Sequence, residues 1–390
     1  MTVAKRDVFN NTIGSPYGFH LPNLTESQGN EILAGLFEQL LIFDRITIST
    51  NRLNFALVFL IQRLGINMVE RLLDSGYIKF MIWSPVVVTG AGKQLDDGTV
   101  DESIIYGQPP IAAGTLMADD ADPEKNVKKA LAHFSFHSER KKIFIKKAVK
   151  NYIVPNGMEF SSDSAKFVID AYKNNNLSGL GLPFEKEPEQ LNLDQRKQLL
   201  DISHKVIETA LLSKYGLKSY ENYEHLEICK QNLLNIGKAY NIADNTSIIL
   251  QLENLPKLKT LYLTERMDFE SAFKIRHLSN AKYYRKWINE VGESSNAQEI
   301  TREYLNEIKG NSKFFDSTGG KLVRNLGMFG IGTTLGNYLI GNPGIVAGGV
   351  LGLLDTFWLE SILKGKNPSM FIEDIRNEAE KVDVDSGGVD

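Results

Sequence analysis

The chain of 390 residues is long enough to bury a large core, and two or three domains are expected. Apolar residues make up 42% and charged residues 24%, which is typical of a globular protein, and the net charge of −4 excludes a global basic field for nucleic acid. The single cysteine, Cys229, excludes an intramolecular disulfide. Since the first residues contain no apolar leader segment, we expect a cytoplasmic bacterial protein. We also expect it to associate with a membrane on activation, for reasons given with the C-terminal part below.

An α+β fold is predicted, and its first 155 residues form a small α/β portion. Alternating apolar residues indicate strands, and apolar residues at i, i+3 and i+4 spacing indicate helices. A strand–helix–strand order predicts a βαβ unit with parallel strands. The predicted elements are an irregular arm over 1–28, a helix over 31–41, a strand over 41–49, a helix over 51–75 ending at Gly76, and one or two strands over 77–89.

Further along the α/β portion, Gln108-Pro109-Pro110 predicts the turn of a hairpin over 103–115, followed by an acidic turn over 117–123. Helices are predicted over 124–138 and 161–174, while 140–152 fits a helix and a strand equally well. The following portion, 156–315, is predicted to be mostly helical. Its expected helices are 192–214, 221–239, 243–253, 268–291 and 297–309, with an extended segment over 255–263.

A charge-free run dominates the C-terminal part, because residues 325–354 contain no Asp, Glu, Lys or Arg. A turn at 341–344 divides it, since proline fixes φ and glycine permits positive φ. The arms 326–340 and 345–354 are predicted to be helical, giving a glycine-rich apolar hairpin within a segment 316–366, followed by a helix end and acidic tail over 367–390. Small residues at four-residue spacing let two helix backbones approach closely. The turn and glycine positions are Gly332, Gly336, Pro343, Gly344, Gly348 and Gly352.

Three interpretations of this hairpin remain open. A membrane-spanning helix needs about 20 apolar residues, and neither arm is that long. The hairpin is then a buried element that closes the fold or covers an oligomer interface, an element that inserts into a membrane on a trigger, or a permanent anchor.

A strand ending in Gly90-Ala91-Gly92-Lys93 suggests a phosphate-binding turn. The third glycine of a dinucleotide motif is replaced by Leu95, and the residues that follow are poor helix formers, so a plain strand-ending turn is favoured. The segment 86–92 resembles the first strand and turn of the sirtuins, although no further part of their pattern follows.

Two groups of residues suggest metal chemistry. His133 and His137 are four apart on a predicted helix, but no glutamate follows the first histidine, and the flanking phenylalanines favour packing. Carboxylates gather in two loops, and Asp44 lies on the predicted strand 41–49, which is how metal-dependent nucleases arrange their ligands. A hydrated acidic loop is the simpler interpretation. The loop carboxylates are Asp96, Asp97, Asp101, Glu102, Asp119, Asp120 and Asp122.

Residues 123–150 contain nine Lys or Arg against two Glu. Such a segment either contacts an anionic surface or forms a solvated face that balances the acidic loops. The candidate contact residues are Lys128, Lys129, Arg140, Lys141 and Lys142.

The sequence assigns no catalytic residue, cofactor or metal site. By analogy, a soluble body with an apolar hairpin is similar to bacterial cell-death or phage-defence effectors. We therefore expect a non-enzymatic effector whose hairpin acts at a membrane or in oligomer assembly. The expected partners are a membrane surface, further copies of the chain or a protein from the same operon, and nucleic acid is less expected. The alternative is a metal-dependent nuclease or phosphate-handling enzyme that uses the α/β portion.

Overall fold

Two long stretches of the chain, 24–83 and 119–155, form most of what the computed structural model describes. The described residues are 7–13, 24–83, 87–89, 93–94, 100–101, 111–113, 119–155, 170, 173–174, 190–192, 194–196, 198–200, 208, 215, 217–219, 248–253, 258–282, 284–285, 323–328, 371, 374–375 and 377–380.

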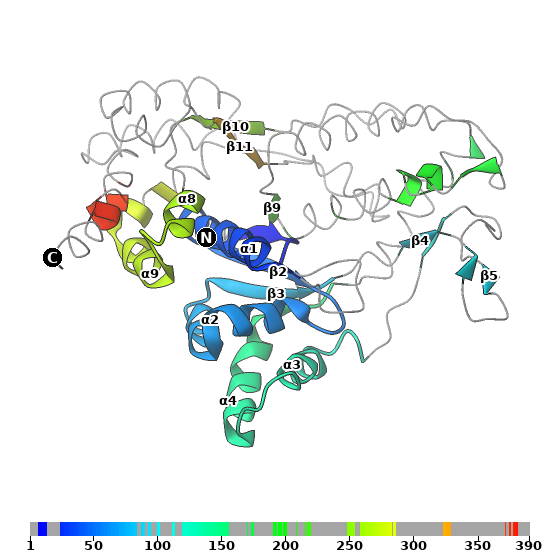
Figure 1. Ribbon diagram of the computed structural model, residues 1–390, viewed down its shortest axis with the longest axis horizontal. Helices are drawn as coiled ribbons and strands as arrows, with labels where there is room; N and C mark the ends of the chain where they lie inside the picture. Colours follow the sequence, from blue (N-terminus) through cyan, green and yellow to red (C-terminus); the bar gives the residue numbers. More distant parts are fainter. Residues whose placement is uncertain are drawn as a thin grey trace, which may run out of the picture.

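Five parallel strands form the central sheet, in the order β8-β3-β2-β1-β9 (Figure 1). From β1 the chain adds β2, β3 and β8 on one side, and β9 then joins the other side of β1. The direction of strand addition therefore reverses at β1. The strands are β1 (Asp7–Asn10), β2 (Arg45–Thr50), β3 (Ile78–Ile82), β8 (Tyr152–Ile153) and β9 (Leu217–Ser219).

Strand alternation divides the sheet into two unlike faces. Val8, Ile46 and Ile48 point into the hydrophobic core that the helices complete. On the opposite face the guanidinium of Arg45 bonds the carboxylate of Asp7 at 2.9 Å, and both residues are buried. Because a buried charge is tolerated when it is paired, this ion pair lets a polar strand such as β1 lie inside the sheet.

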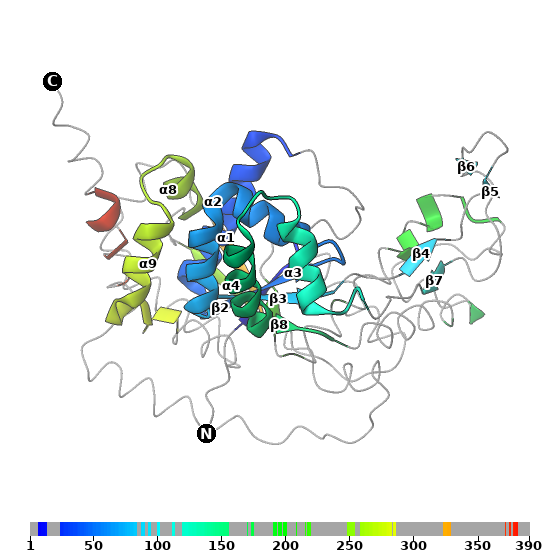
Figure 2. The ribbon, with the colours of Figure 1, turned by 90° about the horizontal axis from the view of Figure 1, so that it is seen from below.

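Helices α2 (Phe55–Asp74), α3 (Pro123–Leu131) and α4 (Ser138–Ala148) cover one face of β2 and β3, as Figures 1 and 2 show together. The buried turn of α2 contributes Leu57 and Leu60 to the core. Gly65 breaks the regular helix with φ 77° and ψ 154°, a conformation that other residues rarely adopt, so α2 bends there. A short 3-10 turn, η1 (Val149–Asn151), links α4 to β8.

Helix α1 (Glu26–Ile42) begins with a capping box, in which Thr25 and Gln28 bond each other's backbone N–H. The helices α8 (Leu258–Leu263) and α9 (Phe269–His277) pack against α1. Arg276 of α9 fixes this contact, since its guanidinium donates to the carbonyls of Leu40, Phe43 and Asp44 at the end of α1. Burial lowers the pKa of Arg276 to about 9, which leaves it charged at neutral pH.

Among the described strands, three small antiparallel pairs lie outside the central sheet. Strand β4 (Val87–Thr89) pairs with β7 (Ile111–Ala113), and β5 (Lys93–Gln94) pairs with β6 (Val100–Asp101). The third pair joins β10 (Ile248–Glu253) to β11 (Val323–Met328), two strands that lie about 70 residues apart in the sequence.

The predicted βαβ unit is confirmed, since β2, α2 and β3 follow one another and the two strands are parallel. The helix in the ambiguous segment 140–152 is α4, and β8 ends that segment. The predicted hairpin arm 103–107 lies outside the described residues, and β7 pairs with β4 instead.

Three sequence predictions are wrong. The predicted irregular arm contains β1, whose polar residues Asp7 and Asn10 find buried partners in Arg45 and Gln39. The predicted helix over 243–253 contains β10, which pairs with β11. Residues 326–328 of the predicted arm 326–340 belong to β11, and the rest of that arm lies outside the described residues. The predicted extended segment 255–263 contains α8, which buries Leu258 and Leu261 at helical spacing. The bounds of the predicted domains stay predictions.

Candidate functional site

The candidate site is the carboxyl edge of the parallel sheet. Because β1, β2, β3 and β8 run in the same direction, their last residues meet at one edge. Ligands of open α/β sheets bind outside this edge, where the direction of strand addition reverses. Here β1 ends in Asn10, and β2 ends in Thr50 and is followed by Asn51. This edge therefore carries amides and a hydroxyl where a ligand would be expected.

Asn54 joins β2 to α2 at this edge. Its backbone is left-handed, with φ 53° and ψ 49°, and its side chain caps α2 by accepting from the N–H of Leu57. The same side-chain oxygen accepts from the hydroxyl of Thr50 at 2.7 Å, and the side-chain amide donates to the hydroxyl of Tyr152 at 2.6 Å. Asparagine tolerates left-handed backbone and supplies a cap, so it suits this position on both counts.

The network continues from Tyr152 into α3. The Tyr152 hydroxyl donates to the side-chain oxygen of Asn126 at 3.1 Å, and the Asn126 amide donates to the backbone carbonyl of Asn51 at 2.9 Å. Burial raises the pKa of Tyr152, and the hydrogen bond from Asn54 opposes that effect. The network thus joins the start of α2, the start of α3 and β8 by side-chain hydrogen bonds.

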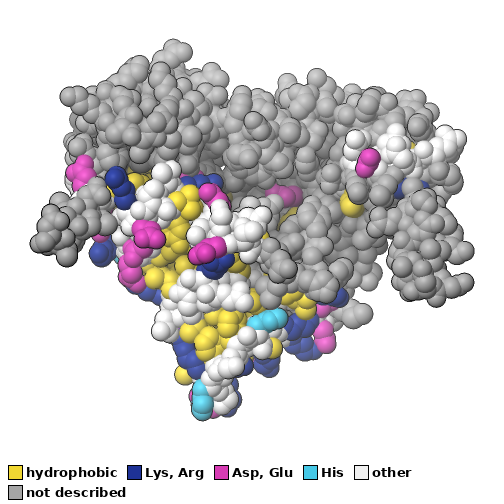
Figure 3. Space-filling model, viewed as in Figure 1, with side chains coloured by type: hydrophobic (Ala, Val, Ile, Leu, Met, Phe, Trp, Pro, Cys, Tyr) yellow, Lys and Arg dark blue, Asp and Glu magenta, His cyan; other side chains and the backbone are white. Residues whose placement is uncertain are grey.

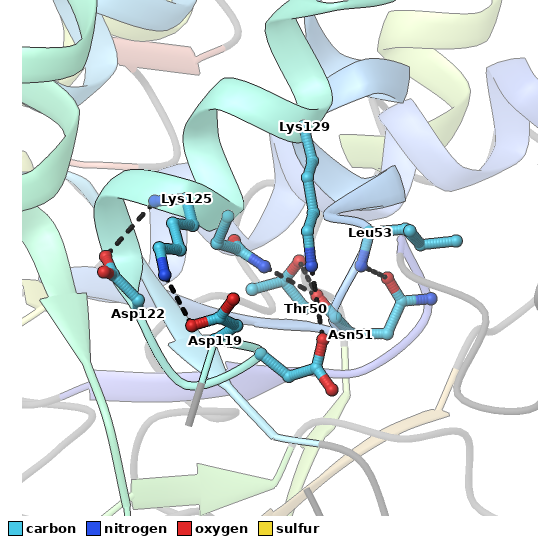
Figure 4. Close-up of polar contacts among 9 residues, drawn as sticks. Thr50, Asn51, Leu53, Asp119, Asp122, Lys125 and Lys129 are labelled. Carbon is cyan, nitrogen blue, oxygen red and sulfur yellow. Dashed lines mark hydrogen bonds and ion pairs between the residues drawn. The ribbon is translucent and has the colours of Figure 1, made fainter. Parts of the chain in front are cut away.

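An acidic loop lies beside this network at the start of α3. Asp122 caps the helix, accepting from the N–H groups of Glu124 and Lys125. The ammonium of Lys125 lies 2.5 Å from Asp119, and that of Lys129 lies 3.2 Å from Asp120, as Figure 4 shows beside Thr50 and Asn51. The hydrogen bond between Lys125 and Asp119 lowers the pKa of the carboxyl and raises the pKa of the amine.

The end of β1 is held by its own turn. The side-chain oxygen of Asn10 accepts from the N–H and the hydroxyl of Thr12 and from the N–H of Ile13, while its amide donates to Gln39 at 2.7 Å. Next to it, Asn11 donates to Glu208 at 3.1 Å. The polar side chains of this edge are thus hydrogen-bonded, and its chemistry consists of amides, carboxylates and lysine ammonium groups.

The sequence candidates for metal binding are not brought together. His133 lies in the turn after α3 with its ring 6.5 Å from that of Phe55, and His137 precedes α4. Within the described residues, no three His, Cys, Asp or Glu side chains are close enough to share a metal ion. Asp96, Asp97 and Glu102 lie outside the described residues, as does Cys229, and Asp101 is described only as part of β6.

Asp44 lies at the opposite edge of the sheet from the acidic loop. It precedes the first residue of β2, and the guanidinium of Arg285 approaches its carboxylate at 3.2 Å. The six residues of β2 separate it from Asn51 by roughly 20 Å. Asp44 and Asp119–Asp122 therefore cannot act on one substrate atom. The nuclease alternative also rests on Asp96 and Asp97, which lie outside the described residues, so it stays a prediction.

The glycine turn at residues 90–93 does not lead into a helix. Strand β4 precedes it and β5 begins at Lys93, and both strands belong to antiparallel pairs outside the central sheet. A dinucleotide site needs a helix N-terminus after the turn. The favoured interpretation, a strand-ending turn, fits this arrangement.

The predicted basic segment forms α3 and α4, and most of its candidate residues lie in ion pairs. Lys128 pairs with Glu124, Lys129 with Asp120, Arg140 with Glu70 and Lys142 with Glu139. Glu70 also accepts from Lys147, and the hydrogen bond from Arg140 is the main reason that the pKa of Glu70 is lowered. Part of the positive charge therefore serves to attach α4 to α2.

The six turn and glycine positions of the predicted hairpin lie outside the described residues. What is described is the start of the charge-free run, where β11 ends at Met328. Among the described helices, none combines the length and the apolar character needed to cross a bilayer.

The residues that hold the carboxyl edge together were not identified from the sequence. Asn51 and Asn54 follow a strand directly, which is a signal that sequence reasoning can use. Asn126 and Tyr152 carry no such signal, because their role depends on a contact between residues 98 positions apart. The chain matches no known family model, and searches among curated proteins and solved structures find no similar protein.

Proposed function

We propose that this chain is a bacterial effector of the cell-death or phage-defence type, whose charge-free run acts at a membrane or in oligomer assembly. The observation that carries the proposal is the run itself, 30 residues from 325 to 354 without a charged side chain. Glycine costs about 1 kcal/mol per position in an exposed helix. A run so rich in glycine therefore gains stability only where it packs closely, in lipid or against protein.

The attachment of the run supports this proposal. Strand β11 pairs with β10 from Val323 to Met328, and it lies beside β9 of the central sheet. The run therefore begins within β11, a strand that is hydrogen-bonded to β10. Such an arrangement suits a segment that moves from water or protein into lipid while the central sheet keeps its fold.

Introducing a charge into the run tests the proposal. A lysine at the centre of a membrane helix costs about 2.5–3.5 kcal/mol, so Leu339→Lys is expected to disfavour insertion strongly. Leu263→Lys is the matched control, because Leu263 lies at the end of α8 and is 39% exposed. Each variant is expressed in bacteria with the full chain, and growth and the membrane-bound fraction are measured.

We expect the unmodified chain and the Leu263→Lys chain to enter the membrane fraction and slow growth, and the Leu339→Lys chain to do neither. If all three chains stay in the soluble fraction without affecting growth, the membrane role is wrong. If Leu339→Lys alone loses its ordered assembly, measured by light scattering, the run acts in oligomer assembly instead.

A second candidate function is a phosphate-handling site at the carboxyl edge. The observation in its favour is that Lys125 and Lys129 lie on the same side of the sheet as Asn51, at the edge where parallel sheets bind ligands, and that Lys129 pairs with Asp120 (Figure 4). Lysine supplies charge for a phosphate, and the amides supply donors. Asp44 has no part in this version, since it lies at the other edge.

This candidate is tested by nucleotide and DNA hydrolysis in the presence of Mg²⁺. Asp120→Asn and Lys129→Gln are each expected to remove the activity, whereas Asp74→Asn, at the end of α2, is expected to leave it unchanged. If activity survives both edge substitutions, the active site lies elsewhere in the chain.

A further inference from the structure

One face of α4 differs from the rest of the basic segment. Successive helix residues are about 100° apart, so positions 139, 142, 143 and 146 of α4 form one stripe within about 100° of arc, and Lys150 follows this stripe in the adjoining η1 turn. The opposite side of α4 carries the buried Phe144 and Ala148. The stripe points away from the core, and with Lys150 included its members are Glu139, Lys142, Ile143, Lys146 and Lys150.

All five residues of this outer stripe are exposed. Lys142 pairs with Glu139 in a solvated i, i+3 contact, which contributes little free energy. No described carboxylate lies within ion-pair distance of Lys146 or Lys150, whereas Arg140 and Lys147 on the flank of α4 are bound to Glu70. Positive charge on the stripe is therefore left without a described carboxylate to neutralise it.

Ile143 lies in the middle of these charges and is 51% exposed, the largest exposure among the large apolar side chains that the structure describes. Figure 3 shows Lys and Arg atoms beside hydrophobic atoms over the tip that Figure 1 assigns to α4. Cations in the last turn of a helix are explained by its macrodipole. That effect explains neither Lys142, which lies before the last turn of α4, nor the exposed isoleucine.

We propose that the outer stripe of α4 docks on an anionic phospholipid surface. Lysines attract the phosphate groups, and a single apolar side chain between them enters the interface between headgroups and acyl chains. A nucleic acid would use the charges but would gain little from Ile143, so the combination favours lipid. This inference rests on the proposed membrane function and names the face of the body that would meet the membrane.

The test is flotation of the purified full chain with vesicles of phosphatidylcholine alone or with added phosphatidylserine. Each lysine near an anionic surface contributes about 1 kcal/mol, so Lys146→Gln with Lys150→Gln is expected to weaken binding about 30-fold. Ile143→Ser is expected to weaken it about 5-fold through lost apolar contact. The matched controls are Lys274→Gln with Lys282→Gln, two exposed lysines on the α9 side, and Leu278→Ser.

Stronger binding to the anionic vesicles, lost in both α4 variants and kept in both controls, supports the proposal. Equal binding to both vesicles, binding to neither, or no effect of either α4 substitution overturns it. Vesicle leakage is measured in the same samples. Leakage that persists in the α4 variants would leave the proposed role of the charge-free run standing even if α4 is not the docking face.

Discussion

Replacing Asn54 tests whether the network at the carboxyl edge holds the start of α2. Asn54→Ala removes the cap of α2, at about 1 kcal/mol, and forces alanine into left-handed backbone, at about 1–2 kcal/mol. It also leaves the buried hydroxyl of Thr50 without its partner at 2.7 Å, which costs about 1–3 kcal/mol. The free energy of unfolding is therefore expected to fall by about 3–6 kcal/mol.

Asn54→Gly separates the backbone contribution from the side-chain contribution. Glycine accepts the φ of 53° without strain and is nearly as good a cap, so the main loss is that of the side-chain hydrogen bonds to Leu57, Thr50 and Tyr152. Asn54→Gly should be more stable than Asn54→Ala by about 2 kcal/mol. Urea unfolding followed by circular dichroism measures this difference. Equal stability of the two variants, or a more stable alanine variant, would refute the reasoning.

Two further predictions concern the ion pairs and caps that join the helices. Arg276→Met should lower the free energy of unfolding by about 3–5 kcal/mol, because the carbonyls of Leu40 and Phe43 lose a buried charged donor. The control Lys274→Met, on the exposed side of α9, should change it by less than about 0.5 kcal/mol. A small effect of Arg276→Met in thermal unfolding would show that α9 does not depend on this contact. Glu70 has a lowered pKa, so its contribution to stability is present above the ordinary value of 4.5 and is lost as the pH falls through the folded value. The decrease in stability between about pH 5 and pH 3 should accordingly be shallower in Glu70→Gln than in the control Glu31→Gln, and equal slopes would contradict the role of Glu70.

The βαβ unit could be predicted because its signals are local. Ile46 and Ile48 alternate with polar residues, and α2 repeats its apolar positions every three or four residues. Strand β1 could not, because its four residues include Asp7 and Asn10, which favour loops when they lack partners. Their partners, Arg45 and Gln39, lie 38 and 29 positions away. Long-range pairing thus overrode local preference, and it did so again when β10 and β11 paired.

The candidate site was predictable to a smaller degree. The acidic turn at Asp119–Asp122 was identified, and so was a basic segment that could balance it, but not which lysine pairs with which aspartate. Asp44 was predicted to lie on a strand, whereas it precedes the first residue of β2 and lies at the opposite edge of the sheet from this turn. The sequence shows which residue types follow each strand. The location of the site also depends on sheet topology, which decides which strand ends lie at the same edge.

The most direct test of the central proposal is release of a trapped dye from vesicles of bacterial lipids by the purified full chain. If the charge-free run acts at a membrane, the unmodified chain and the control Leu263→Lys should release the dye, and Leu339→Lys should not. If the unmodified chain releases no dye, or if Leu339→Lys releases it equally well, the run does not act in lipid and the proposal is contradicted.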